Sequence, residues 1–434
     1  MTYTKRLQQR EKETGRPIRI GLAGAGQMGS GYVAQVQRIA GMEIGAIADV
    51  DPTRAEAAYK AAGMEVSSES DGRHQIVTDA LALAHCDVDV VVDATGVPNV
   101  GAALSLAALR AGKHVALLNV ECDVTVGYLL AAVARTHRTV YTVCRGDEPA
   151  EARLLVEYAR DLAFEVICAG KGKNNSLDPT ATPDTLTAEA ASKNMNPKML
   201  CSFVDGSKAM IEMASLANGT GLEVSRRGMN GPPATISTLS DIFRPTADGG
   251  VLDRAGVVDY CTGPVAPGVF VIVRTDDPTV HEEMTYLKMG HGPYFTLYRP
   301  YHLASIEAPL SISEAVLDST ASLVPIAWNA EVGTAAKRDL AAGDALDGIG
   351  GSTVYGIIEA AATFTAENLL PLGLVGGAKV LRPVAKGEML TYDDVEWSED
   401  SVIRTLRRLQ DRQLAERWTD AQTVAAVDEA IPPR

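Results

Sequence analysis

Apolar residues recur with two alternating periods over roughly the first 145 positions of the chain. Continuous apolar runs predict buried strands, and runs with an apolar residue every three or four positions predict helices. We expect a strand that begins at residue 18 and further strands at residues 42–48, 88–96, 114–120 and 139–144, with helices at 32–39, 100–111 and 128–136 between them. Strands that alternate with helices in this way predict an α/β fold with a doubly wound parallel sheet.

The pattern changes in the middle of the chain. Helical periods at residues 151–162, 183–194, 199–217 and 309–319 surround a strand at 164–170 and a region, 219–300, in which short strands alternate with glycine and proline turns. This mixture predicts an α+β domain with an antiparallel sheet. Short strands near residues 331 and 378 predict a small β module, and a charged helix is expected at 398–417 with a frayed remainder. The expected segments are an N-terminal arm (1–16), a dinucleotide-binding domain (17–150), a catalytic domain (151–325), a β module (326–397) and a C-terminal helix and tail (398–434).

A glycine motif follows the first predicted strand. Gly24, Gly26 and Gly29 have the spacing G-x-G-x-x-G and precede a predicted helix. In this context the first glycine permits a tight turn, the second lets the backbone approach a pyrophosphate, and the third lets the helix pack closely on the strand. The N-terminus of the helix offers free N–H groups to the phosphates. The sequence therefore predicts a dinucleotide site.

The next predicted strand ends at Asp49, 20 residues after Gly29. A carboxylate in this place accepts hydrogen bonds from the adenosine ribose and repels a 2′-phosphate, which favours NAD over NADP. Arg54 leaves use of NADP open. The residues expected to bind the cofactor are Gly24, Gly26, Gln27, Met28, Gly29, Asp49, Thr95, Gly96, Asn119 and Glu121.

Composition narrows the class of protein. The 434 residues are 46% hydrophobic and 22% charged, which is typical of a folded, water-soluble chain. The net charge of −15 argues against a nucleic-acid or anionic-membrane partner. No apolar run approaches the length of about 18 residues that predicts a membrane helix. Six scattered cysteines and a charged N-terminal segment favour a reducing, cytoplasmic location.

Three polar clusters are candidates for chemistry. Lys171, Lys173, Asn174 and Asn175 follow a predicted strand, and a lysine with a lowered pKa can take or give a hydroxyl proton, although a solvated turn has the same pattern. Asp147 and Glu148 are adjacent acids that can bind a metal, orient a substrate hydroxyl or cap the next helix. The remaining candidates are the acid–base pair Asp205 and Lys208, together with Arg299 and His302.

With these motifs in view, the chain resembles a known family. The stretches that carry the resemblance are residues 93–96, 112–115, 146–149, 169–175, 203–208 and 299–303. It resembles the homoserine-dehydrogenase-like oxidoreductases with a C-terminal SAF (β-clip) domain, and among them it is similar to the 1-deoxy-D-xylulose 5-phosphate reductoisomerase-like (DRL) proteins. The resemblance implies a Rossmann domain, a catalytic domain that also makes a dimer contact, and a SAF domain near residues 330–397.

The resemblance also implies a reaction, in which a sugar phosphate is rearranged and then reduced by NADPH. On this basis Lys171 and Lys173 would hold a phosphate or the reacting oxygen, Asp147 and Glu148 would orient the polyol, and Asp205 and Lys208 would be the acid–base set. Asn174, Asn175, Arg299 and His302 are the other expected substrate contacts.

Asp49 departs from the family reaction, because an acidic residue there suits NAD rather than NADPH. We therefore expect an NAD(P)-dependent reductoisomerase or dehydrogenase that acts on a small polyol, sugar acid or sugar phosphate, as a homodimer or larger homo-oligomer. The need for a divalent metal stays open, and the sequence assigns no metal ligands. A homoserine-type amino-acid dehydrogenase and a non-enzymatic NAD-binding sensor are the alternatives.

Overall fold

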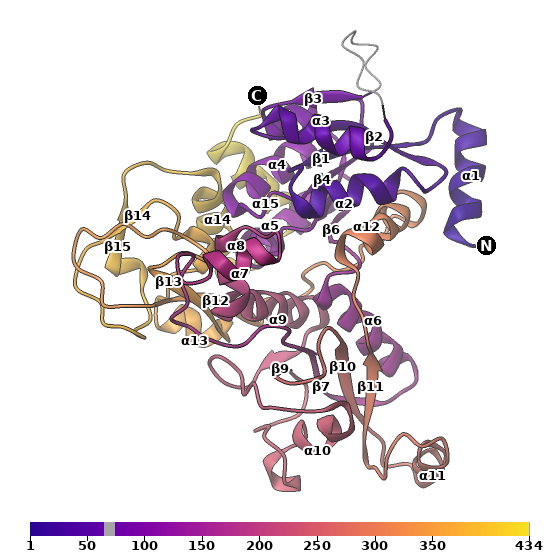
Figure 1. Cartoon of the computed structure of the whole chain (residues 1–434), viewed down its shortest axis with the longest axis vertical. Coiled ribbons are helices and arrows are strands. Elements are labelled where there is room, and N and C mark those ends of the chain that lie inside the picture. Colours follow the sequence, from indigo (N-terminus) through magenta and orange to yellow (C-terminus); the bar gives the residue numbers. More distant parts are fainter. Residues whose placement is uncertain (65–73, 434) are drawn as a thin grey trace. The chain divides into compact units, whose positions relative to one another are not determined.

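The structure, a computed structural model, describes residues 1–64 and 74–433. The chain divides into two compact units (Figure 1). Unit 1 contains Met1–Asp147, Leu303–Val324 and the C-terminal segment from Asp400, and unit 2 contains Glu148–His302 and Pro325–Glu399.

Unit 1 is built on a six-stranded sheet with the order β3-β2-β1-β4-β5-β6, in which all neighbouring strands are parallel. The strands are β1 (Ile18–Ala23), β2 (Met42–Ala48), β3 (Gln75–Val77), β4 (Val90–Asp93), β5 (His114–Leu117) and β6 (Tyr141–Val143). Every residue of β1 and β4 is buried, as expected for strands covered on both faces. This strand order is that of a doubly wound dinucleotide-binding sheet, and the predicted fold class is confirmed.

Helices from three parts of the sequence complete unit 1. They are α1 (Tyr3–Thr14), α2 (Gln27–Val36), α3 (Pro52–Ala61), α4 (Pro98–Arg110), α5 (Val120–Thr136), α12 (Ala304–Ser313), α14 (Val402–Glu416) and α15 (Asp420–Ala430), with a short 3-10 turn η1 (Ala80–Ala84) and a π turn η4 (Glu314–Asp318). Helix α12 packs on α2, and α14 and α15 pack on α5. The prediction of a frayed C-terminal tail is wrong, because the tail contains helix α15. This helix begins with a reciprocal capping box between Thr419 and Gln422.

Unit 2 contains a five-stranded sheet with the order β11-β10-β7-β9-β8. Its strands are β7 (Glu165–Gly172), β8 (Glu223–Val224), β9 (Val257–Cys261), β10 (Val269–Arg274) and β11 (Tyr294–Arg299). The sheet is mixed rather than purely antiparallel, because β9 pairs in parallel with β7 and β8. Helices α6 (Glu148–Asp161) and α9 (Ser207–Thr220) pack on each other and on strands of this sheet.

The remaining elements of unit 2 are short. They are α7 (Thr187–Ser192), α8 (Pro197–Val204), α10 (Leu239–Ile242), α11 (Pro278–Tyr286), α13 (Ala361–Ala366), the turns η2 (Ile236–Thr238), η3 (Thr246–Asp248), η5 (Leu372–Leu374) and η6 (Tyr392–Asp394), and the antiparallel pairs β12 (Ala330–Ala336) with β13 (Val354–Ala360) and β14 (Ala378–Val380) with β15 (Val395–Trp397). The two strand pairs are the expected small β module.

The helix expected at residues 199–217 is two helices in the structure. Gly206 separates α8 from α9 and has φ +93°, a left-handed conformation that continues neither helix. This break places Asp205 at the start of α9, where its carboxylate accepts a hydrogen bond from the Ser207 N–H at 2.8 Å. Among residues 1–64 and 74–433, no helix is both long and apolar enough to cross a membrane.

Candidate active site

The glycine motif forms a tight turn between β1 and α2. Gly24 has φ +90°, and a Cβ there would lie 2.8 Å from the Ala94 carbonyl oxygen. A Cβ on Gly29 would collide with the Gly24 carbonyl oxygen. A Cβ on Gly26, by contrast, would meet no atom within 4 Å. The open space at Gly26 lies where a pyrophosphate needs close approach to the backbone, so this turn fits a dinucleotide.

The first turn of α2 has no side-chain cap, because the N-cap residue is Gly26. Gln27 and Met28, the first two residues of the helix, are exposed. The N–H groups of this turn are therefore left for a ligand.

Asp49 is buried at the end of β2 and supports the glycine turn directly. Its Oδ2 accepts a hydrogen bond from the Ala25 N–H at 2.8 Å, and its Oδ1 accepts one from the Asp51 N–H at 3.0 Å. Arg54 has an exposed side chain with Nε 3.7 Å from an oxygen of Asp51. The structure thus ties Asp49 directly to the glycine turn.

Asp93 organises the other expected cofactor contacts. It is fully buried at the end of β4, and its carboxylate accepts hydrogen bonds from Thr95 N–H at 2.9 Å, Thr95 Oγ1 at 2.7 Å and Asn119 Nδ2 at 2.8 Å. Burial raises the pKa of Asp93, and these hydrogen bonds oppose the rise. Gly96 follows in the left-handed region with φ +64°, and Glu121 is buried in the first turn of α5.

Asn119 has a second task, because its Oδ1 caps α5 through the Cys122 N–H at 3.2 Å. Sequence reasoning did not single out Asp93 for this role. Its position at the end of a fully apolar strand was the available signal.

Lys171 is the centre of a buried charged cluster in unit 2. It lies near the end of β7, and its Nζ donates to Glu148 Oε1 at 2.5 Å and to Glu212 Oε2. Burial by itself lowers the pKa of Lys171, but the charges and hydrogen bonds of the two carboxylates outweigh it, and the pKa lies well above its ordinary value. Lys171 is therefore an ammonium group that donates hydrogen bonds rather than a general base.

Glu148 also contacts His302, which is the last residue of the first segment of unit 2. His302 Nε2 lies 3.3 Å from Glu148 Oε1, the same oxygen that accepts from Lys171. Burial raises the pKa of Glu212, and the charge of Glu148 raises it further. Asp147, the residue before Glu148, is buried at the end of the first segment of unit 1.

Lys173 has a different environment from Lys171. Its Nζ donates to three backbone carbonyl oxygens, those of Asn175 at 2.8 Å, Ser176 at 3.1 Å and Phe203 at 2.7 Å. Burial and the charge of Lys171 lower the pKa of Lys173 to about 8. The three hydrogen bonds hold the turn that contains Asn174, which is exposed, and Asn175, which is half-buried.

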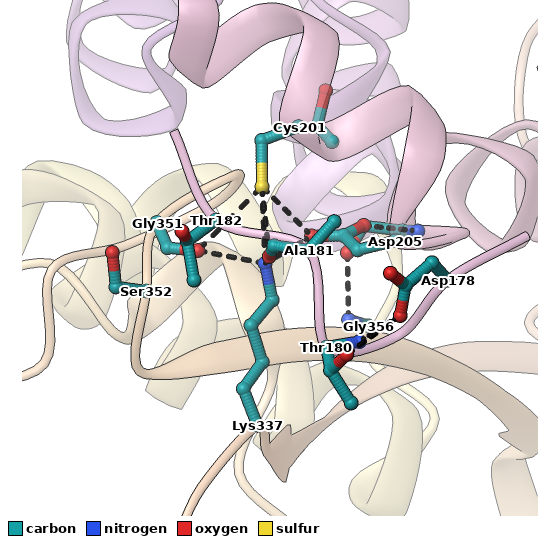
Figure 2. Close-up of polar contacts among 12 residues, drawn as sticks. Asp178, Thr180, Ala181, Thr182, Cys201, Asp205, Lys337, Gly351, Ser352 and Gly356 are labelled. Atoms are coloured by element: carbon teal, nitrogen blue, oxygen red, sulfur yellow. Dashed lines mark hydrogen bonds and ion pairs between the residues drawn. The ribbon is translucent and has the colours of Figure 1, made fainter. Parts of the chain in front are cut away.

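Asp205 pairs with Lys337 rather than with Lys208. Figure 2 shows the buried Lys337 ammonium, which lies 2.8 Å from Asp205 Oδ2 and 3.2 Å from Cys201 Sγ. Lys208 is half-buried in the first turn of α9, and its charge acts on Glu212, whose pKa it lowers. The structure therefore separates the predicted acid–base pair into two different environments.

Arg299 completes the list of expected residues. It ends β11, forms an ion pair with the buried Glu151 of α6, and stacks on the Tyr301 ring with Cζ 4.4 Å from its centroid. Glu151, Glu212 and Lys337 were missed from the sequence, because each lies in an ordinary helical or strand pattern and gains its meaning from a distant partner.

The carboxylates of the cluster also bear on the metal question. Oxygen atoms of Glu148 and Glu212 lie within 4.8 Å of each other, and such oxygens suit a hard divalent cation. In the described residues the Lys171 ammonium already binds both carboxylates. A metal would add to or compete with this ammonium.

Three family models match the chain. Residues 24–143 match "Homoserine dehydrogenase, NAD binding domain", residues 146–308 match "Oxidoreductase DRL, catalytic domain", and residues 333–396 match "SAF domain". Together these matches support an NAD(P)-dependent oxidoreductase.

The three matched regions follow one another in the order that the resemblance implied, with an NAD-binding domain of the homoserine dehydrogenase type first, a DRL-type catalytic domain next and a SAF domain last. These matches favour an enzyme over the expected alternative of an NAD-binding sensor.

Curated relatives are distant. The chain is 28% identical to 1-deoxy-D-xylulose 5-phosphate reductoisomerase of Ralstonia pickettii (strain 12J) over 52% of this chain and 56% of the relative. It is 30% identical to the protein of the same name from Geobacillus sp. (strain WCH70) over 33% of this chain and 35% of the relative. The chain therefore spans between about a third and a little over half of the length of these relatives.

Among solved structures, the chain is similar to two enzymes of Lactobacillus casei. Scyllo-inositol dehydrogenase is 16% identical, with 65% of this chain and 76% of that chain covered and a TM-score of 0.38. Myo-inositol dehydrogenase is 14% identical, with 65% and 74% covered and a TM-score of 0.37. At these scores the similarity identifies neither substrate nor activity.

Proposed function

We propose that the protein transfers a hydride between NAD(H) and a small polyhydroxylated substrate, which is a polyol, a sugar acid or a sugar phosphate. The observation that carries the proposal is the buried Lys171 ammonium held between Glu148 and Glu212. Paired carboxylates accept hydrogen bonds from substrate hydroxyls, and an ammonium stabilises the negative charge that develops on the reacting oxygen. The preference for NAD is supported by the buried Asp49.

The residues of unit 2 have distinct roles in this proposal. The bound cofactor supplies or accepts the hydride. In the oxidative direction Lys171 Nζ donates a hydrogen bond to the substrate oxygen, which lowers the cost of its charge. Glu148 Oε1 takes the hydroxyl proton, and its contact with His302 Nε2 at 3.3 Å keeps the carboxylate in place. Arg299, Asn174 and Asn175 are proposed substrate contacts.

Catalytic roles for Lys173, Asp205 and Lys208 remain proposals of lower rank. The hydrogen bonds of Lys173 go to backbone carbonyls, and Asp205 is paired with Lys337. Both observations favour a supporting role over direct proton transfer. The proposed cofactor contacts in unit 1 are those expected from the sequence, with Thr95 and Asn119 held by Asp93.

The assay is a titration of the protein with NAD(H) and NADP(H), followed by a substrate panel with and without a divalent ion. The panel contains polyols, sugar acids and sugar phosphates, and it includes 1-deoxy-D-xylulose 5-phosphate because similar proteins bear the name of its reductoisomerase. We expect turnover with one of these classes. Lys171→Met should abolish it and leave cofactor binding intact, whereas Lys193→Met, at an exposed lysine, should change neither. Full turnover in Lys171→Met refutes the role of the cluster.

A second candidate is a homoserine-type dehydrogenase, favoured by the match of residues 24–143 to the homoserine dehydrogenase NAD-binding domain. Turnover of an amino alcohol such as homoserine, without turnover of any polyol or sugar derivative, would select it.

We also propose a homodimer or larger homo-oligomer in the cytoplasm, to be measured by light scattering and cell fractionation. The five segments with limits at residues 16, 150, 325 and 397 stay a prediction.

A further inference from the structure

Helix α9 is tied to the hairpin β12–β13 at both of its ends. At the start of α9, Ser207 Oγ accepts a hydrogen bond from the Gly356 N–H of β13 at 2.8 Å. At its far end, the Asn218 side chain donates to the Ala330 carbonyl oxygen at 3.0 Å and accepts from the Ala330 N–H at 2.9 Å. The hairpin includes the first strands of the region that matches the SAF domain. The hairpin therefore contacts α9 near both ends of the helix.

The dimensions of the two elements agree with this description. The 11 residue steps from Ser207 to Asn218 rise about 17 Å along α9, and the four residue steps from Ala330 to Thr334, the strand partner of Gly356, span about 14 Å of β12. Gly356 permits close approach, since a Cβ there would lie 3.4 Å from the Ser207 Cα and closer still to Leu372 and Val332. The hairpin can thus hold both ends of α9 at once.

Lys337 adds a charged tie at the start of α9. It follows β12 directly, and its buried Nζ donates to the carbonyl oxygens of Ala181 at 2.8 Å and Gly351 at 2.7 Å and pairs with Asp205 at 2.8 Å (Figure 2). The second oxygen of Asp205 accepts from the Ser207 N–H, the first N–H of α9. One lysine therefore connects the β module to the first turn of the helix through a single carboxylate.

The middle of α9 contains Glu212, whose carboxylate binds Lys171. We infer that the hairpin β12–β13 positions Glu212 against Lys171, and that Lys337 is a positioning residue of the candidate active site. Any consequence for turnover rests on the proposed function. The β module is then a required part of the catalytic unit rather than an independent attachment.

The experiment measures Lys171 itself. Displacement of Glu212 removes one of the two carboxylates that raise the pKa of Lys171, so the free-amine fraction at a fixed pH increases. We expect Lys337→Met to increase acylation of Lys171 by an amine-reactive reagent about tenfold, which corresponds to one pKa unit. Peptide mass spectrometry reads the acylation, and the exposed Lys193 is the internal reference. The matched control is Lys379→Met, at an exposed lysine of β14, which should leave Lys171 unchanged.

Two further variants separate positioning from general stability. Lys337→Met with Asp205→Asn removes both charges of the pair, which should restore thermal stability and keep the increased acylation of Lys171. Asn218→Ala loosens the opposite end of α9 and should increase acylation as well. If acylation in these variants stays at the wild-type level while the melting temperature falls, Lys337 is merely structural and the inference is wrong.

The inference and the proposed function fail separately. If Lys171→Met retains turnover but Lys171 acylation still responds to Lys337→Met, the positioning inference holds and the proposed function is wrong. If Lys171→Met abolishes turnover but acylation does not respond to Lys337→Met, the function holds and the positioning inference is overturned.

Discussion

Replacement of Lys171 by methionine gives the most informative test of the buried cluster. Methionine keeps much of the length of the side chain and removes its charge. Glu148 and Glu212, with oxygens within 4.8 Å of each other, would then be left without their ammonium partner. Removal of one partner from a buried ion pair costs about 3–5 kcal/mol, or about 6–20 °C in the melting temperature of a domain of roughly 150–250 residues.

The loss of stability should depend on pH. In the wild type the raised pKa of Lys171 means that its contribution is complete below the ordinary lysine value of 10.5 and is lost only as the pH rises through the higher folded value. In the variant, burial and the charge of Glu148 still raise the pKa of Glu212. Its folded form then binds a proton that the unfolded form releases, so the variant regains stability as the pH falls through that raised value toward 4.5.

The assay is thermal unfolding of the wild type, Lys171→Met and Lys193→Met, followed by tryptophan fluorescence at about pH 8 and about pH 5. We expect the difference between wild type and Lys171→Met to be larger at the higher pH, and Lys193→Met to resemble the wild type at both. A difference below about 1 kcal/mol, the scale of an exposed ion pair, would refute the reasoning. An equal difference at both pH values would refute the assignment of the raised pKa of Glu212.

Three other predictions concern the cofactor turn and Lys173. Gly26→Ala should leave the melting temperature unchanged, because the new Cβ meets no protein atom within 4 Å, and it should weaken NAD(H) binding, because the Cβ enters the space proposed for the pyrophosphate. Gly29→Ala should lower the melting temperature, because its Cβ collides with the Gly24 carbonyl oxygen. The same effect on the melting temperature in both variants would contradict this prediction. Asp49→Ala should weaken NAD(H) binding about tenfold, close to the value of one charge-assisted hydrogen bond, and shift preference toward NADP(H), and an unchanged preference in a fluorescence titration would argue against the role of Asp49. Burial lowers the pKa of Lys173 to about 8, so between pH 8 and 10.5 the folded state binds fewer protons than the unfolded state. The wild type should therefore gain stability relative to Lys173→Met as the pH rises through this range. If the difference in melting temperature between the two proteins stays constant from pH 8 to 10.5, the lowered pKa is excluded.

The cofactor-binding turn in unit 1 could be predicted from the sequence, because the residues that indicate it lie close together along the chain. Gly24, Gly26 and Gly29 lie within six residues, and Asp49 ends the next strand, so their spacing alone indicates a dinucleotide turn. The structure adds that the Asp49 carboxylate binds the Ala25 N–H inside this turn.

The candidate active site in unit 2 could be predicted only in part from the sequence. Lys171 and Glu148 were expected to contribute to catalysis, but their pairing was not, because they lie 23 positions apart and on different elements. Glu212 gave no signal at all, since it lies in the middle of a helix with small and apolar neighbours. The predicted pair of Asp205 and Lys208 failed for a related reason. Proximity in sequence suggested a partner, and the fold supplied Lys337 instead, 132 positions later.

The sequence by itself determined the elements whose formation depends on neighbours along the chain, namely the parallel strands and the glycine turn. The tertiary structure decided which buried charges meet. A buried charge is stable only beside an opposite charge or a set of hydrogen-bond partners, and the packing of α6, β7 and α9 selects those partners. For that reason the binding of a dinucleotide follows from local pattern, whereas the protonation of Lys171 and the role of Lys337 follow only from the folded chain.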